Sequence, residues 1–197
     1  MKRLFDILVS LIILTIFALP MMLIALVVRL SSRGPAFYWS DRVGFENNVF
    51  RMPKFRTMRV DTPEMGKHLL PGEQDWVTPV GRFLRKTSLD ELPQVLSILR
   101  GRMSFVGPRP VLPNEKVLIA MRTLQGVHRV KPGLTGWAQI NGRAELKVQE
   151  KLEFDVEYVK KRSFFFDIRI MFLTAGKVIR RKDVDQESAL KEPESNH

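Results

Sequence analysis

The adjacent carboxylates Asp90 and Glu91 are the most informative chemical feature of the sequence. They lie in the stretch TSLDELPQ, residues 87–94, where a helix is expected to begin. A capping box would start that helix at Ser88, but Pro93 would then interrupt its hydrogen bonding. A start at Asp90 puts Pro93 in the first turn, where no intrahelical donor is needed. The helix dipole there favours ionised carboxylates and the free N–H groups suit a phosphate, although capping alone also explains an isolated pair.

Basic residues accompany this pair in the sequence. Arg109 lies between two prolines in the run GPRP, residues 107–110, and a guanidinium held in this way can bind phosphate bidentately. Arg85 lies five residues before Asp90, and Lys54 and Arg56 share the strand-like run KFRTM. Each cation alone is equally compatible with a solvated surface charge, and GPRP alone with a rigid turn. Together they predict an anion-binding region.

The composition supports an anionic ligand and limits the metal chemistry. The 197 residues carry a formal net charge of +11, and residues 29–143 hold 19 basic against nine acidic residues. The middle segment therefore suits phosphate groups, anionic lipids or nucleic acid. The chain has no cysteine and three histidines, which excludes disulfide scaffolds, thiolate nucleophiles and cysteine-ligated metals. Any metal would be a hard cation such as Mg²⁺ on oxygen ligands.

An apolar segment near the N-terminus predicts membrane association. Residues 7–28 contain no charge and would form a helix about 33 Å long, enough to cross a bilayer core. The run is long for a cleaved signal peptide. A straight crossing is one interpretation, but Pro20 can bend the helix, and basic residues flank both ends. A bent helix that returns to the same leaflet is therefore the second interpretation, and both stay open.

The remaining elements follow from periodicity and from helix-breaking residues. Strands are expected at 36–39 and 49–58, with a turn around Gly44 and residues 46–48. Because of Pro53, the second strand should lie at an edge or be broken there. Residues 129–142 contain several Gly and Pro residues and predict an ordered loop. Helices are expected at about 90–100, 114–125, 145–162 and 164–182. The last of these suits either a core helix or, as the nearby membrane segment favours, an interfacial one.

These blocks closely resemble the monotopic phosphoglycosyl transferases, the bacterial sugar transferase family. The resemblance covers residues 2 to about 180, in the family's order. It rests on KRLFD at 2–6, KFRTM at 54–58, SLDELPQ at 88–94, MSFVGPRP at 103–110 and RVKPGLTGWAQINGR at 129–143.

The resemblance implies transfer of a sugar phosphate from a UDP-sugar to a polyprenol phosphate such as undecaprenol phosphate, with release of UMP. Asp90 would form a covalent phosphosugar intermediate and contact Mg²⁺, with Glu91 supporting it. The implied phosphate and nucleotide contacts are Lys54, Arg56, Arg85, Pro108, Arg109, Asn141 and Arg143. Carboxylate nucleophiles and a charge-neutralising cation suit this chemistry. Inner-membrane lipids of the cytoplasmic face and a second copy of the chain are further candidate partners, and no nucleic acid is expected.

The implied fold is mainly α with a small β-hairpin, an α+β class. It contains a re-entrant membrane helix at 1–30, a cytosolic and interfacial catalytic domain at 31–182, and an acidic, disordered tail at 183–197. Leu19-Pro20 replaces the family's usual Ser-Pro at the helix break. A membrane-tethered nucleic-acid-binding protein or a scaffold without catalysis is the alternative. The first gives no reason for the carboxylate pair, and the second predicts that Asp90→Asn leaves activity intact.

Overall fold

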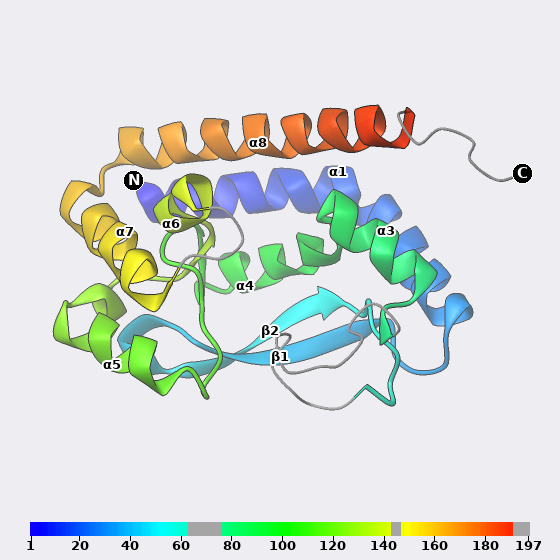
Figure 1. Cartoon of the computed structure of the whole chain (residues 1–197), viewed down its shortest axis with the longest axis horizontal. Coiled ribbons are helices and arrows are strands. Elements are labelled where there is room, and N and C mark those ends of the chain that lie inside the picture. Colours follow the sequence, from blue (N-terminus) through cyan, green and yellow to red (C-terminus); the bar gives the residue numbers. More distant parts are fainter. Residues whose placement is uncertain (63–75, 143–146, 191–197) are drawn as a thin grey trace, which may run out of the picture.

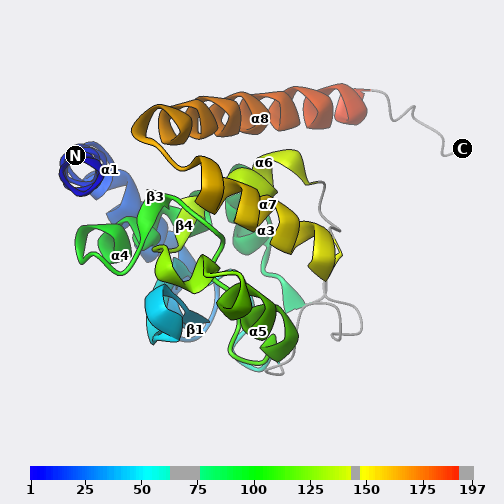
Figure 2. The ribbon, with the colours of Figure 1, turned by 90° about the vertical axis from the view of Figure 1, so that its left-hand side faces the viewer.

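The computed structural model describes residues 1–62, 76–142 and 147–190, with backbone alone for 178–190. Helices pack around a β-hairpin and a short parallel strand pair, so the expected class is confirmed. Helix α8 lies along the top of Figures 1 and 2, and the hairpin lies at the bottom. The helices are α1 Lys2–Ser31, α3 Pro79–Thr87, α4 Val95–Leu99, α5 Lys116–Leu124, α6 Trp137–Asn141, α7 Val148–Lys161 and α8 Phe164–Leu190. The strands are β1 Phe37–Val43, β2 Val49–Phe55, β3 Ser104–Val106 and β4 Gly133–Thr135.

Helix α1 is long and apolar enough to cross a membrane. Only 6% of its apolar stretch is buried in the described protein, so most of the stretch is exposed. Pro20 lies inside the helix. In Figure 1 the first part of α1 runs beneath α8, and the later part turns downward toward β1. Large apolar side chains such as Ile16, Leu19 and Met22 are exposed along it. Such a continuous apolar face is compatible with a membrane anchor.

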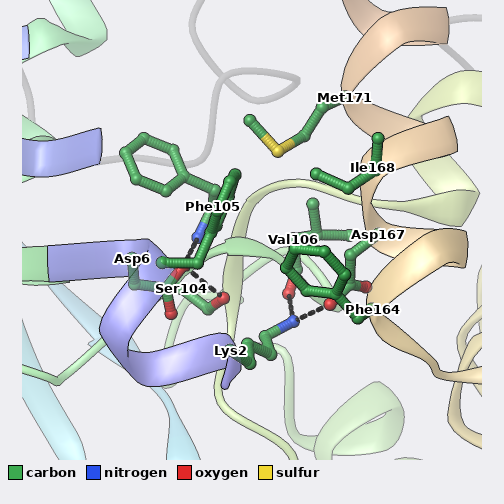
Figure 3. Close-up of a pocket in the computed structure, with 10 residues that line it drawn as sticks. Lys2, Asp6, Ser104, Phe105, Val106, Phe164, Asp167, Ile168 and Met171 are labelled. Atoms are coloured by element: carbon green, nitrogen blue, oxygen red, sulfur yellow. Dashed lines mark hydrogen bonds and ion pairs between the residues drawn. The ribbon is translucent and has the colours of Figure 1, made fainter. Parts of the chain in front are cut away.

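Polar contacts attach the start of α1 to the rest of the protein (Figure 3). Lys2 Nζ donates to the Val106 carbonyl at 2.8 Å and pairs with Asp167 of α8. The buried carboxylate of Asp6 accepts from Ser104 Oγ at 3.2 Å. Buried charges are costly unless they are paired. This network therefore fixes the N-terminal end of α1 against β3 and α8.

The hairpin is antiparallel, and its register pairs Tyr38 with Lys54 and Arg42 with Phe50. Its turn contains Glu46 and Asn47 at positive φ, which confirms the predicted turn. Pro53 is tolerated because each strand of a two-stranded sheet is an edge strand. Phe55 at the end of β2 packs with Val28 of α1 and Leu84 of α3. The hairpin is therefore fixed to the later part of α1.

The segment that carries the carboxylate pair differs in detail from the expected helix. Helix α3 ends at Ser88, which adopts a left-handed conformation with φ of 58°. A 3-10 helix, η3 Leu89–Gln94, follows and leads into α4. Asp90 lies in the first turn, as predicted, but the turn is 3-10 and Pro93 interrupts no α-helical bond.

The loop expected at 129–142 is wrong in part, because this region contains β4 and α6. The breakers flank these elements, with Gly136 before α6 and Gly142 after it. Strand β4 pairs in parallel with β3. A Cβ on Gly133 would lie 2.1 Å from the Gly107 nitrogen, so this crossing requires glycine. The backbone of α8 continues past residue 182 to Leu190, into the segment expected as a tail, and residues 191–197 lie outside the described part.

Candidate active site

Glu91 joins cations from two other parts of the chain. Its Oε1 accepts from Lys54 Nζ of β2 at 2.6 Å and from Arg109 Nη2 at 3.0 Å. Neighbouring Asp90 is buried, with 9% of the residue exposed, and forms no ion pair with any described residue. The structure thus brings together four predicted site residues, and Asp90 is the carboxylate of this group that pairs with no described cation.

The two carboxylates experience opposite pKa shifts. Burial raises the pKa of Asp90, and the nearby charges of Lys54 and Arg85 oppose that shift. Burial acts in the same direction on Glu91, but Arg109 and Lys54 together outweigh it and lower the pKa of Glu91 to about 2. Burial also lowers the pKa of Lys54, against the attraction of Glu91. Glu91 is therefore the fixed counter-ion of the cluster, and Asp90 is a partly desolvated carboxylate.

Contacts from α5 and β4 position the loop that carries Arg109. The Pro108 carbonyl accepts from the Gly133 nitrogen at 3.0 Å. Arg122 of α5 donates from Nη1 to the Arg109 carbonyl at 2.9 Å and from Nε to Asp155 Oδ2 at 2.9 Å. Asp155 of α7 is 1% exposed. The orientation of Arg109 thus depends on an ion pair between α5 and α7.

Arg85 and Arg56 donate to groups outside the Glu91 cluster. Arg85 donates from Nε to Thr57 Oγ1 at 2.9 Å, and its charge acts on Asp90. Arg56 donates to the Ser32 and Arg33 carbonyls, at 2.8 and 2.7 Å, where α1 ends. This arrangement satisfies helix-end carbonyls and directs Arg56 away from Glu91.

The remaining predicted contacts are not brought to the carboxylates by any described hydrogen bond or ion pair. Asn141 is exposed and donates to the Trp137 carbonyl within its own helix, at 2.9 Å. Arg143 lies outside the described residues. The roles that the resemblance assigns to Arg56, Asn141 and Arg143, like those of the carboxylate pair and its cations, therefore stay predictions.

Asp90 has the chemistry that a Mg²⁺ ligand requires. In the described part of the chain, no three His, Cys, Asp or Glu side chains cluster closely enough to hold a metal by themselves. Mg²⁺ is commonly held by one or two carboxylates together with substrate phosphates and water. The carboxylate of Asp90, which pairs with no described cation, fits this pattern, since substrate phosphates would complete the ligand set.

Sequence reasoning did not identify Arg42, Arg122 or Asp155. Arg42 approaches the GPRP loop through the Pro110 carbonyl, at 3.5 Å. Asp155 and Arg122 are separated by 33 residues, and their meeting depends on the packing of α7 against α5. One available signal was an acid at 155 on the otherwise apolar face of Leu152, Val156 and Val159, where an unpaired charge would be costly.

Comparison with known proteins identifies the family of the chain. The bacterial sugar transferase family model matches residues 1–181. The "Uncharacterized sugar transferase EpsL" of Bacillus subtilis is 41% identical over 94% of this chain and 91% of that protein. The "Exopolysaccharide production protein ExoY" of Rhizobium meliloti is 38% identical over 88% of this chain and 83% of that protein.

A longer relative carries a more specific name. The "UDP-glucose:undecaprenyl-phosphate glucose-1-phosphate transferase" of Escherichia coli is 43% identical over 90% of this chain, which spans 40% of that protein's length. The family match covers the segments that carry Asp90, Glu91 and Arg109. The chain therefore belongs to the bacterial sugar transferase family and is a phosphoglycosyl transferase, as its sequence predicts.

Proposed function

We propose that this chain transfers a sugar phosphate from a UDP-sugar to a polyprenol phosphate, with undecaprenol phosphate as the preferred carrier and UMP as the second product. The observation that carries the proposal is that the buried carboxylate of Asp90, which pairs with no described cation, adjoins the cation-bound carboxylate of Glu91. Lys54 and Arg109 concentrate positive charge where two phosphate-containing substrates must meet.

The proposed reaction has two displacement steps. A carboxylate oxygen of Asp90 attacks the phosphorus that bears the sugar, and the bond from that phosphorus to the bridging oxygen breaks as UMP leaves. A phosphate oxygen of the polyprenol phosphate then attacks the same phosphorus and releases the Asp90 carboxylate. The enzyme divides one difficult transfer into two, and neither step needs a proton.

Each neighbouring residue has a defined task in this scheme. Glu91 holds Lys54 and Arg109 beside Asp90, and these cations stabilise the negative charge on the reacting phosphates. Asp90 and substrate phosphates would hold Mg²⁺, whose charge offsets that of the leaving group. Partial desolvation of Asp90 makes its carboxylate more nucleophilic once these cations keep it ionised.

The packing around the carboxylates suggests how a membrane substrate reaches them. Leu89 and Leu92 of η3 pack in the cluster that contains Val28 and Ile24 of α1. The 3-10 helix that carries the reacting carboxylate therefore packs in the same apolar cluster as α1. We propose that α1 is re-entrant and that the enzyme acts on the cytoplasmic face of the bacterial inner membrane. It would catalyse an early membrane step of polysaccharide or glycan synthesis there.

Purified enzyme supplied with UDP-sugars and Mg²⁺, but without acceptor, tests the covalent step. Mass spectrometry should find one sugar phosphate on the peptide that contains Asp90, and added polyprenol phosphate should remove it. Asp90→Asn should lose both the adduct and UMP release, whereas the exposed Asp41→Asn should retain both. Product formation without any adduct would show direct transfer, and an adduct on Asp90→Asn would place the nucleophile elsewhere.

A further inference from the structure

Arg42 lies on the inward face of the hairpin. Directly paired residues of an antiparallel sheet share a face, and side chains alternate along each strand. The register therefore places Arg42 and Ser40 on the face that also carries Met52 and Lys54. Ser40 and Met52 are buried, at 4% and 3% exposed, so this face points into the protein. Arg42 and Lys54 are therefore two cations on the same, inward face of the hairpin.

In the part of the chain that the structure describes, no acidic side chain pairs with Arg42. Its Nε donates to Ser40 Oγ at 3.0 Å, and its Nη1 makes a long contact with the Pro110 carbonyl at 3.5 Å. Both acceptors are neutral. Arg42 forms no salt bridge with any residue that the structure describes, and its Nη2 group donates no hydrogen bond there. Half-buried guanidinium groups are normally paired, because desolvation without a partner is costly.

The surrounding charges define what the missing partner should be. Burial and the nearby charge of Arg109 lower the pKa of Arg42, and Glu115 and Glu91 act in the opposite direction. Glu91 is already shared by Lys54 and Arg109, and the Glu115 carboxylate accepts from the Leu112 nitrogen, so no described carboxylate is bonded to Arg42. An anion between Arg42 and Arg109 would relieve their repulsion and satisfy the unused donors.

The position of Arg42 favours the soluble substrate over the lipid. Phe55, at the base of the hairpin, packs with Val28 of α1, whereas Arg42 pairs with Phe50 near the hairpin turn. Tyr38, the partner of Lys54, lies four positions before Arg42 on β1. Four positions correspond to about 13 Å along a strand. Arg42 therefore approaches the site from the end of the hairpin farther from the apolar helix.

We propose that Arg42 is a further substrate-binding residue that contacts a phosphate of the donor nucleoside diphosphate, on the side that leaves as the nucleoside monophosphate. This inference rests on the proposed function. Arg42 and Arg109 would bind the diphosphate from opposite sides, while Lys54 faces Asp90. The same contact would strengthen binding of the nucleotide product.

Arg42→Gln and Arg42→Lys test this assignment, with Arg51→Gln as the matched control. Arg51 belongs to the same hairpin but lies on its opposite face, where its guanidinium stacks 5.6 Å from the Trp39 ring centre. For each folded variant we would measure four quantities: KM for the UDP-sugar, KM for the polyprenol phosphate, kcat and the inhibition constant of UMP. Thermal unfolding midpoints verify the fold of each variant.

Loss of one charge-assisted hydrogen bond should raise KM for the UDP-sugar and the UMP inhibition constant by about 10- to 100-fold in Arg42→Gln. Arg42→Lys should recover part of the loss, and Arg51→Gln should behave like the unchanged enzyme. If KM for the UDP-sugar and the UMP inhibition constant are the same in Arg42→Gln as in the enzyme without substitutions, the assignment of Arg42 is wrong. The proposed function is tested separately, by UMP release from the enzyme without substitutions. A rise confined to KM for the polyprenol phosphate would assign the contact to the lipid phosphate and would also overturn the proposal.

Discussion

Removal of the Asp155 carboxylate should weaken both the fold and the Arg109 loop. Asp155 is 1% exposed and binds Arg122 through Nε at 2.9 Å and Nη2 at 2.5 Å. Asp155→Asn keeps the shape of the side chain but leaves the Arg122 guanidinium buried without its counter-ion. Breaking a buried ion pair from one side costs about 3–5 kcal/mol of unfolding free energy. At typical urea dependences, this lowers the unfolding midpoint by about 1–3 M.

The same substitution should impair catalysis through Arg109. Arg122 Nη1 holds the Arg109 carbonyl at 2.9 Å, and Arg109 in turn binds Glu91 at 3.0 Å. A displacement of a positioned catalytic group by about 1 Å can cost about 100-fold in rate. We therefore expect UMP release by Asp155→Asn to fall by about 10- to 100-fold at saturating substrates, in an assay at a temperature where the variant remains folded.

The double variant Arg122→Met with Asp155→Leu separates the two effects. Replacing a buried pair by apolar side chains of similar volume is often neutral or stabilising, so the urea midpoint should recover. Activity should stay low, because methionine cannot donate to the Arg109 carbonyl. A double variant with full stability and unchanged kcat would refute the reasoning that Arg122 positions the loop. Recovery of activity in step with stability would show that the pair serves the fold alone.

Two further predictions concern Glu91 and the membrane helix. The pKa of Glu91 falls from 4.5 to about 2 on folding, so its ion pairs stabilise the protein fully above about pH 4.5 and lose that contribution as the pH falls toward 2. The difference in unfolding free energy between the unchanged protein and Glu91→Gln should therefore shrink between pH 5 and pH 2.5, and a constant difference would contradict the pairing. For the topology, a cysteine fused before Met1 and Gln125→Cys should both be labelled from the cytoplasmic side only. Since the sequence has no cysteine of its own, labelling of the first from outside would establish a full crossing.

The sequence alone determined features that depend on neighbouring residues. Pro93 and the flanking residues located the carboxylate pair in the first turn of a short helix, as the structure confirms. The turn residues 46–48 and the strand-like runs around them predicted the hairpin, because backbone preferences at a tight turn are local. The same local logic failed at 129–142, where glycines were counted as breakers although Gly136 and Gly142 mark the two ends of α6.

Only the tertiary structure decided which cations meet Glu91. In a continuous extended strand, Lys54 and Arg56 would share a face. In the structure β2 ends at Phe55, and Arg56 donates to carbonyls just after α1. Arg122 and Arg42 carried no local signal that distinguished them from surface charges. Their roles depend on chain segments that lie far apart in the sequence and meet because buried apolar faces pack together. This packing sets the direction of each charged side chain. It leaves no periodic pattern in the sequence around the charged residue, so the sequence alone does not reveal the role.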